Sequence, residues 1–165
     1  MTIAFDLDDT LFPEIEFVRS AYRAISRHFS RPSLVRDMEC ASGPREAFDI
    51  AVGKLGLHDA AQLIALYRDH YPDISLTPAV EKTLGELKDR GIVLALITDG
   101  RSITQRNKIS ALGLERFIAP EHILISEETG ADKLNSRPFE LLESASNSQP
   151  YIYVGDKPST DFYDR

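Results

Sequence analysis

Four short apolar segments, each followed at once by polar residues, limit the fold of this 165-residue chain more than any other feature. The segments are residues 2–5, 92–97, 123–125 and 151–154. Apolar runs of this length, bounded by turn-forming residues, are typical of buried strands. Stretches with helical spacing separate the last three segments, and right-handed crossovers make such strands parallel. We therefore expect an α/β fold in which a parallel sheet carries helices on both faces.

Two aspartates, Asp6 and Asp8, stand where the first segment ends. Side chains along a strand alternate with a period of two, so both carboxylates project to the same side. Carboxylates held this close repel each other unless a cation or a shared proton offsets the repulsion. The pair therefore indicates that one acid serves as a nucleophile or ligand and the other as a proton donor.

Polar residues also follow the other three segments. In an open parallel sheet, ligands bind beyond the carboxyl ends of the strands, so we expect these residues to join the aspartate pair in one site. The residues are Thr98, Asp99 and Gly100 after the second segment, Lys133 after the third, and Asp156 and Asp161 after the fourth. A cluster of carboxylates without a Cys/His set suits a hard cation, and Mg²⁺ is the ion that we expect.

Residues 14–75 contain no strand pattern and interrupt the α/β alternation. Apolar residues at three- and four-residue spacing predict a first helix whose buried face holds Ile15, Val18, Tyr22, Ile25 and Phe29. We expect residues 1–13 and 76–165 to form the α/β core and residues 14–75 to form a small helical part.

Composition limits the partners and the cellular location that we expect for the protein. The formal net charge is −7, and no block of Lys and Arg suggests a nucleic-acid partner. Cys40 is the single cysteine, so no internal disulfide can form, which fits a reducing, cytoplasmic location. No apolar segment approaches membrane-spanning length, and the first residues lack a secretory pattern. We expect a cytoplasmic protein that binds neither nucleic acid nor membranes.

Taken together, the motifs resemble those of the haloacid dehalogenase superfamily, and specifically its phosphatase branch. That family shares Asp-x-Asp-x-Thr, a strand ending in Thr or Ser, a Lys, and Gly-Asp followed by a further Asp. Those motifs are matched here by Asp6-x-Asp8-x-Thr10, Thr98, Lys133, and Gly155-Asp156 with Asp161, and the resemblance spans essentially the whole chain. It implies a Rossmann-like core, with residues 14–75 as a helical cap inserted after the first strand.

The resemblance also implies an activity and its catalytic residues. It implies Mg²⁺-dependent hydrolysis of a small phosphorylated metabolite through an aspartyl phosphate, with Asp6 as nucleophile and Asp8 as general acid and base. Dehalogenating relatives lack a carboxylate at the position of Asp8, which favours phosphoryl transfer. Thr98, the amides around Asp99 and Gly100, and Lys133 would bind the phosphoryl oxygens.

The implied metal ligands are carboxylates and one carbonyl. Asp6, the main-chain carbonyl of Asp8 and Asp156 would hold the ion, while Asp161 would bind a metal water or orient Lys133. In relatives a Pro follows the Lys, whereas here Leu134 follows Lys133 and the Pro is displaced to Pro138.

The sequence stops soon after the fourth motif, where relatives continue through a further helix and at least one strand. We therefore expect the fourth strand to be a sheet edge with an exposed apolar flank, and either a homodimer or reduced stability.

Several functional alternatives stay open at this point. Phosphate could pass to a second substrate rather than to water, or the chain could be a signalling or binding module that accepts phosphate without turnover. It could also be a truncated, inactive relative of the family. The phosphorylated substrate itself carries no sequence signature.

Overall fold

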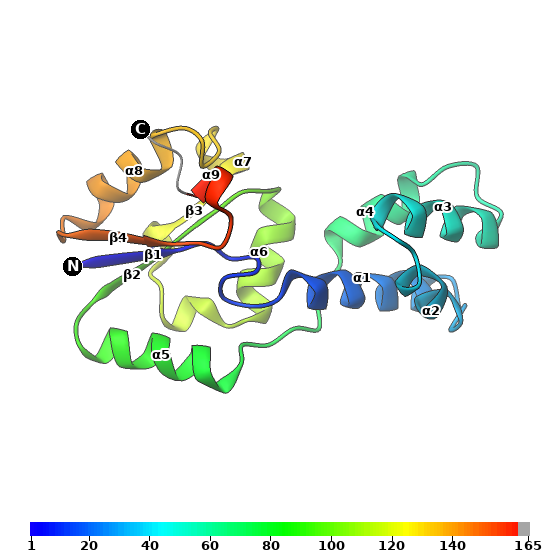
Figure 1. The fold of residues 1–165 in the computed structure, drawn as a ribbon, viewed down its shortest axis with the longest axis horizontal. Coiled ribbons are helices and arrows are strands. Elements are labelled where there is room, and N and C mark those ends of the chain that lie inside the picture. Colours follow the sequence, from blue (N-terminus) through cyan, green and yellow to red (C-terminus); the bar gives the residue numbers. More distant parts are fainter. Residues whose placement is uncertain (162–165) are drawn as a thin grey trace. The chain divides into compact units, whose positions relative to one another are not determined.

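A four-stranded parallel sheet forms the centre of one of two compact units in the structure, a computed structural model that describes residues 1–161. Its strands are β1 (Thr2–Phe5), β2 (Val93–Thr98), β3 (Ile123–Ile125) and β4 (Tyr151–Val154). Their order across the sheet is β3-β2-β1-β4, and each neighbouring pair is parallel (Figure 1). The predicted α/β fold is confirmed, and all four predicted strands are present.

The register of the sheet brings the polar strand ends together. Phe5, the last residue of β1, pairs with Leu96 of β2 on one side and with Val154 of β4 on the other. The residues that follow β1 therefore lie between those that follow β2 and β4. This central place of β1 is what puts the first aspartate pair in the middle of the strand-end loops.

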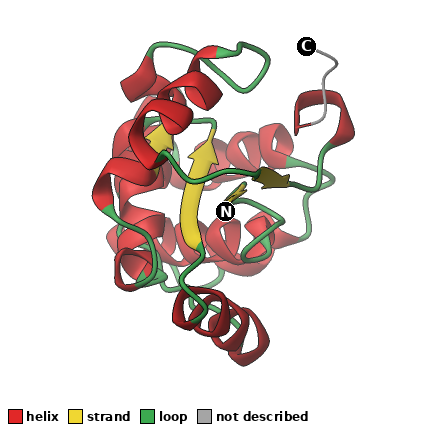
Figure 2. Cartoon of the chain, turned by 90° about the vertical axis from the view of Figure 1, so that its left-hand side faces the viewer, coloured by secondary structure: helices red, strands yellow, loops and turns green. Residues whose placement is uncertain are grey.

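Helices cover both faces of the sheet. Helix α5 (Pro78–Asp89) and helix α8 (Arg137–Ser146) both contact β2, and Figure 1 shows them on opposite sides of the strands. The turned view in Figure 2 shows helices, in red, around the yellow strands. Thr77 caps the start of helix α5, because its Oγ1 accepts a hydrogen bond from the amide of Val80. The remaining helices of this unit are α6 (Ser102–Ala111), α7 (Ser126–Thr129), α9 (Pro158–Asp161) and the 3₁₀ turns Leu114–Arg116 and Pro120–His122.

Strand alternation divides the apolar residues between the two faces. Ala4, Ala95 and Ile97 pack in one cluster with Leu142 of α8. Their neighbours along the strands point to the other face, where Leu84 of α5 is also fully buried. Strands β1, β2 and β3 thus contribute apolar surface to both layers, which explains why these segments are apolar without interruption, whereas alternate residues of β4 are exposed.

Residues Ile15–Ile74 form a second compact unit, separate from the unit made by Met1–Glu14 and the chain from Ser75 onward. It contains four helices, and its core includes Tyr22, Ile25, Leu34, Met38 and Leu63. The helices are α1 (Glu14–His28), α2 (Leu34–Glu39), α3 (Pro44–Leu55) and α4 (Ala61–Asp69).

The buried face of α1 differs from the predicted one at its start. Ile15 is 50% exposed, whereas Phe17, Ala21 and Ile25 are buried in a stripe at four-residue spacing. Ile15 precedes Phe17 by two residues, and two residues turn a helix through roughly 200°. It therefore lies on the opposite side of α1 from that stripe.

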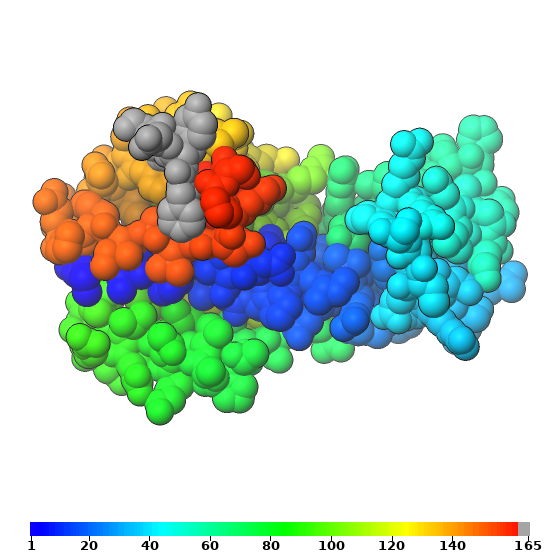
Figure 3. Space-filling view, in the orientation of Figure 1, coloured from blue at the N-terminus to red at the C-terminus, as the bar shows by residue number. Residues whose placement is uncertain are grey.

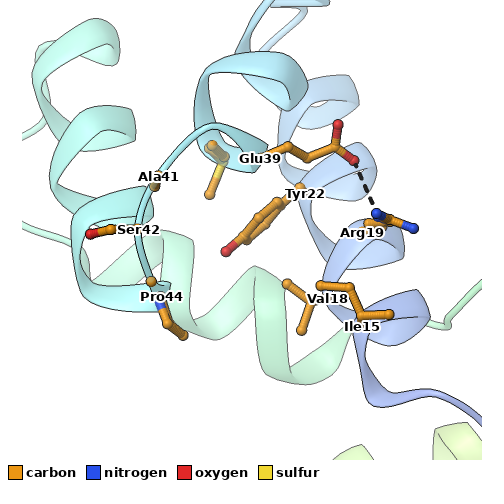
Figure 4. Close-up of a pocket in the computed structure, with 10 residues that line it drawn as sticks. Ile15, Val18, Arg19, Tyr22, Glu39, Ala41, Ser42 and Pro44 are labelled. Atoms are coloured by element: carbon orange, nitrogen blue, oxygen red, sulfur yellow. Dashed lines mark ion pairs between the residues drawn. The ribbon is translucent and has the colours of Figure 1, made fainter.

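The helical unit encloses a cavity of about 300 Å³ among α1, α2 and the start of α3. Figure 4 shows the ring of Tyr22 between these elements, with its hydroxyl directed toward Pro44. At the edge of the cavity, Arg19 and Glu39 form an ion pair of 3.9 Å between two partly exposed side chains. A pair of this length and exposure contributes little to stability.

Strand β4 lies at the edge of the sheet, as predicted. Ile152 is 44% exposed and Val154 is 38% exposed, and Figure 3 shows the β4 segment in orange on the surface of the core unit. The predicted apolar flank is therefore present. Within residues 1–161, no helix is both long and apolar enough to span a membrane.

Candidate active site

The strand ends of the core unit surround a cavity of about 210 Å³. Six of the eight predicted site residues line it, and the other two are Gly100 and Asp161. The lining residues are Asp6, Asp8, Asp9, Glu14, Thr98, Asp99, Lys133, Asp156, Lys157 and Thr160. The acidic residues come from three separate strand ends, as the parallel register requires.

Asp6 lines this cavity and is 6% exposed. Its amide donates a hydrogen bond of 2.8 Å to the carbonyl oxygen of Val154, which ties it to β4 as the sheet ends. Burial raises the pKa of Asp6 above its ordinary value, and the neighbouring Lys133 partly opposes this effect. The nearby ammonium group thus favours the ionised form of this buried carboxylate.

Lys133 is buried between two carboxylates. Its Nζ lies 2.9 Å from Oδ2 of Asp6 and 2.6 Å from Oδ1 of Asp161. Burial acts to lower the pKa of Lys133, but the bonds to Asp161 and Asp6 outweigh it and the pKa is raised. The displaced proline does not keep this loop from reaching the site, because the amide of Lys133 donates to Oδ1 of Asp99 at 3.1 Å.

Asp161 is held from three sides. Its Oδ2 accepts the amide hydrogen of Lys157 at 2.9 Å, and the hydroxyl of Tyr153 lies 3.4 Å from its Oδ1. Burial acts to raise the pKa of Asp161, yet the bonds from Lys133 and Lys157 prevail and the pKa is lowered. The contact between Asp161 and Lys133 fits the predicted role of orienting Lys133.

Gly155 lets Asp161 approach this closely. A Cβ at Gly155 would fall 2.6 Å from Cγ of Asp161 and 2.9 Å from its Cβ, closer than real side chains come. A side chain at this position would push Asp161 away from Lys133. The close approach of Asp161 thus explains on steric grounds why the residue of the predicted Gly-Asp motif at position 155 is glycine.

Three carboxylates are placed where they could hold a cation. Asp6, Asp156 and Asp161 each offer one oxygen, and these oxygens lie within 4.8 Å of one another. Hard oxygen ligands at this spacing suit Mg²⁺, so the donor set fits the expected ion. Asp6 and Asp161 are buried and already paired with Lys133, so the exposed Asp156 is the carboxylate of this group most open to an ion.

The predicted phosphate-binding residues of the second strand end divide into two groups. Thr98 and Asp99 line the cavity, and Thr98 is 2% exposed. Gly100 has φ of 143° and donates its amide hydrogen to Oγ of Ser126 at 2.9 Å. That amide is used within the protein here, and the structure does not bring it to the cavity lining.

Asp8 has two partners that the sequence interpretation missed. Nζ of Lys108 lies 2.7 Å from Oδ1 and 2.9 Å from Oδ2 of Asp8. Nε2 of Gln105 lies 3.1 Å from Oδ2 of Asp8 and 2.6 Å from Oγ1 of Thr98. Both residues belong to α6, which follows the second strand end. Their three-residue spacing, which places them on one helix face, was the available signal.

Comparison with known proteins agrees with this geometry. The family model of haloacid dehalogenase-like hydrolases matches residues 3–163, nearly the whole chain. The chain belongs to the haloacid dehalogenase-like hydrolases. The predicted family is thereby confirmed, and the chain is an enzyme of this hydrolase class.

Several curated members of the family are similar in sequence. The glyceraldehyde 3-phosphate phosphatase of Pyrococcus furiosus is 31% identical over 180 residues, covering 98% of this chain and 74% of the relative. The phosphoserine phosphatase of Thermus thermophilus is 32% identical over 151 residues, or 86% of this chain and 58% of that protein. A member with different chemistry, (S)-2-haloacid dehalogenase 1 of a Pseudomonas species, is 28% identical over 113 residues, 62% of this chain and 50% of the relative.

Solved structures of the family share the fold. The HAD-superfamily protein YfnB of Bacillus subtilis, solved bound to magnesium, superposes with a TM-score of 0.66 at 21% identity, covering 97% of this chain and 79% of YfnB. A HAD-superfamily hydrolase of subfamily IA from Geobacter sulfurreducens gives a TM-score of 0.66 at 16% identity, with 98% and 80% covered. At these identities the likeness extends to the fold.

Proposed function

We propose that this haloacid dehalogenase-like hydrolase is a Mg²⁺-dependent phosphatase that cleaves a small phosphorylated metabolite through an aspartyl phosphate on Asp6. The observation that carries the proposal is the grouping of Asp6, Asp8, Thr98 and Lys133 around one cavity at the strand ends. Phosphoryl transfer needs a nucleophile, neutralised phosphoryl oxygens and a protonated leaving group. Asp6 would meet the first need, Lys133 and Thr98 the second, and Asp8 the third.

Asp6 is the proposed nucleophile. Its carboxylate would attack phosphorus and form an acyl phosphate, while the phosphorus–oxygen bond to the leaving group breaks. Lys133 lies 2.9 Å from Oδ2 of Asp6, so its positive charge supports the ionised, nucleophilic form and offsets the charge of an arriving phosphoryl group.

Asp8 is the proposed acid and base. It would donate a proton to the departing alkoxide, and later accept one from the water that cleaves the acyl phosphate. It lines the same cavity as Asp6 from two residues further along the loop. A carboxylate at this second position is the feature that favours phosphoryl chemistry over carbon–halogen cleavage.

Asp6, Asp156 and the main-chain carbonyl of Asp8 are the proposed Mg²⁺ ligands. Asp161 lies close to this group and is bonded to Lys133. When bound, the ion would neutralise charge on the phosphoryl oxygens and orient them for in-line attack. Thr98 would donate its hydroxyl hydrogen to one of those oxygens. The same role for the Gly100 amide would require its bond to Ser126 to open.

The substrate class follows from the relatives. Two curated family members act on glyceraldehyde 3-phosphate and on phosphoserine, according to their names, and both compounds are small phosphomonoesters. We infer a phosphorylated metabolite of similar size. The helical unit of residues 15–74 is proposed as the cap that selects it, because it is inserted directly after the loop that carries Asp6 and Asp8.

A homodimer formed through strand β4 is also proposed. Ile152 and Val154 are exposed, and β4 has no second neighbouring strand within residues 1–161, which supports the proposal because apolar edge strands tend to pair with a second chain.

Turnover of p-nitrophenyl phosphate with Mg²⁺ tests the proposal. The chain should release inorganic phosphate, and Asp6→Asn should abolish release, whereas Asp49→Asn at an exposed site of the helical unit should not change it. After an acid quench, mass spectrometry should detect one phosphoryl group on the peptide that contains Asp6. No turnover of any phosphomonoester, with Mg²⁺ binding intact, would instead favour a binding module. Phosphate found on a second substrate would show a transferase.

A further inference from the structure

Two buried polar residues of α6, Gln105 and Lys108, contact the proposed machinery without belonging to any motif used above. Gln105 is 2% exposed and Lys108 is 3% exposed. A lysine is almost never this buried unless it is paired, and a buried amide needs its hydrogen bonds satisfied. Here both residues use polar atoms on Asp8, which points to a role at that carboxylate.

Lys108 holds Asp8 in a two-point contact. Its Nζ reaches both carboxylate oxygens, at 2.7 Å and 2.9 Å, and the amine also lies 6.0 Å from the ring centroid of Phe12. A charge-assisted contact to both oxygens restrains the rotation of the carboxylate about its last bond. The direction in which Asp8 presents its oxygens to the cavity is therefore set by α6.

Gln105 connects Asp8 to Thr98. Nε2 of Gln105 donates a hydrogen bond of 3.1 Å to Oδ2 of Asp8. The same nitrogen lies 2.6 Å from Oγ1 of Thr98. Thr98 consequently accepts from Gln105, and its own hydroxyl hydrogen is directed elsewhere, available to a phosphoryl oxygen.

The backbone around Gly100 makes room for this bridge. A Cβ on Gly100 would lie 3.2 Å from both Cγ and Cδ of Gln105, tighter than nearly all real contacts, at a φ that side chains rarely adopt. The absence of a side chain at Gly100 therefore leaves space for the side chain of Gln105. This gives a second physical reason for glycine at a position first interpreted as phosphate-binding.

We propose that Lys108 and Gln105 are positioning residues: Lys108 orients the Asp8 carboxylate for proton transfer, and Gln105 orients the Thr98 hydroxyl for phosphate. The proposal rests on the proposed function, since it assumes that Asp8 handles the proton of the leaving group. It differs from a purely structural role because it predicts for which substrates kcat falls when each side chain is replaced.

Leaving groups provide the test. An alkyl phosphate needs its leaving oxygen protonated, whereas p-nitrophenolate leaves readily without an acid. Lys108→Met should lower kcat about 100-fold on an alkyl phosphate such as 2-phosphoglycolate, and less than about fivefold on p-nitrophenyl phosphate. Gln105→Met should lower kcat on both substrates, because the Thr98 contact serves either one. Lys108→Arg should restore part of the alkyl activity. Lys82→Met, at a lysine whose side chain is 76% exposed, is the matched control and should change neither rate.

A double variant keeps the test decisive if Lys108→Met folds poorly. Asp8→Asn/Lys108→Met removes both charges, so no unpaired ion is left buried. If Lys108 acts through Asp8, the double variant should be no slower on the alkyl phosphate than Asp8→Asn alone. Equal losses on both leaving groups for Lys108→Met, or additive losses in the double variant, would overturn the positioning role. If Asp8→Asn itself shows no dependence on the leaving group, the proposed function of Asp8 has failed instead.

Discussion

The ammonium group of Lys133 lies 2.6 Å from Oδ1 of Asp161, and both side chains are buried in the core unit. The same nitrogen serves Asp6 at 2.9 Å, so one cation balances two carboxylates that come from opposite ends of the chain. This balance determines how the site responds to substitution and to pH.

Lys133→Met should destabilise the protein by about 3–5 kcal/mol, because it leaves Asp6 and Asp161 buried without a counter-charge. Phosphatase activity should be lost as well. Urea denaturation followed by circular dichroism measures the first effect. Lys82→Met is the control, since Lys82 pairs with Glu86 on the surface and such pairs contribute less than about 1 kcal/mol. Wild-type stability in Lys133→Met would contradict the buried triad.

Gly155→Ala should displace Asp161, because the new Cβ collides with its carboxylate and the neighbouring atoms belong to a short, buried side chain. We expect a lower melting temperature and weakened turnover, measured by calorimetry and phosphate release. Gly85→Ala in α5 provides the contrast, as its Cβ would meet nothing within 4 Å. That change should stabilise the helix by up to about 1 kcal/mol. A harmless Gly155→Ala would show that Asp161 is not held as described.

Stability should fall in acid partly through Asp161. Its folded pKa lies below the ordinary value of 3.8, so its ionised form stabilises the folded state above that value. This contribution disappears as the pH falls below 3.8 through the folded pKa. Comparing the unfolding free energies of wild type and Asp161→Asn isolates the effect from that of Asp6, whose pKa is shifted upward. The difference between the two proteins should shrink below pH 3.8; a constant difference would argue against it.

Asp156→Asn should weaken Mg²⁺ binding by at least about tenfold, because it removes an exposed carboxylate from the three-acid group. Titration calorimetry measures this directly, and a chelator should abolish wild-type turnover until Mg²⁺ is added back. Asp49→Asn tests for a general effect of lost charge and should bind as wild type does. An unchanged affinity of Asp156→Asn for Mg²⁺ would show that Asp156 is not a ligand of the ion.

Strand β4 should mediate self-association. Sedimentation velocity of the wild type is expected to show a dimer, and Ile152→Lys should shift it toward monomer, because a charge on an edge strand opposes pairing. Thr83→Lys in exposed α5 adds the same charge away from the edge. A wild-type protein that is monomeric at every concentration would reject the dimer.

The fold was largely predictable because apolar strand segments and the polar residues after them are local signals. Once strands are parallel, their carboxyl ends share one edge, and so Asp6, Thr98 and Lys133 could be expected to meet. The burial of Lys133 between two acids agrees with that expectation.

Other features could not be predicted from local patterns. Gln105 and Lys108 occupy a helix in which polar residues three apart usually face water, and only the packing of α6 beside the loop after β1 turns them inward. The Gly100 amide was expected to face a ligand, but Ser126 accepts its hydrogen. Ile15 was assigned to the buried face of α1, where the helix instead buries Phe17.

The sequence by itself determined which residues end each strand, since hydrophobic runs and their polar termini are properties of neighbouring residues. Only the tertiary structure decided which charged side chains form ion pairs and hydrogen bonds with one another. Whether a lysine is buried against a carboxylate or solvated depends on residues about a hundred positions away, as Lys108 and Asp8 show. No local pattern encodes that distance, because the free energy that settles it comes from burial in the assembled core.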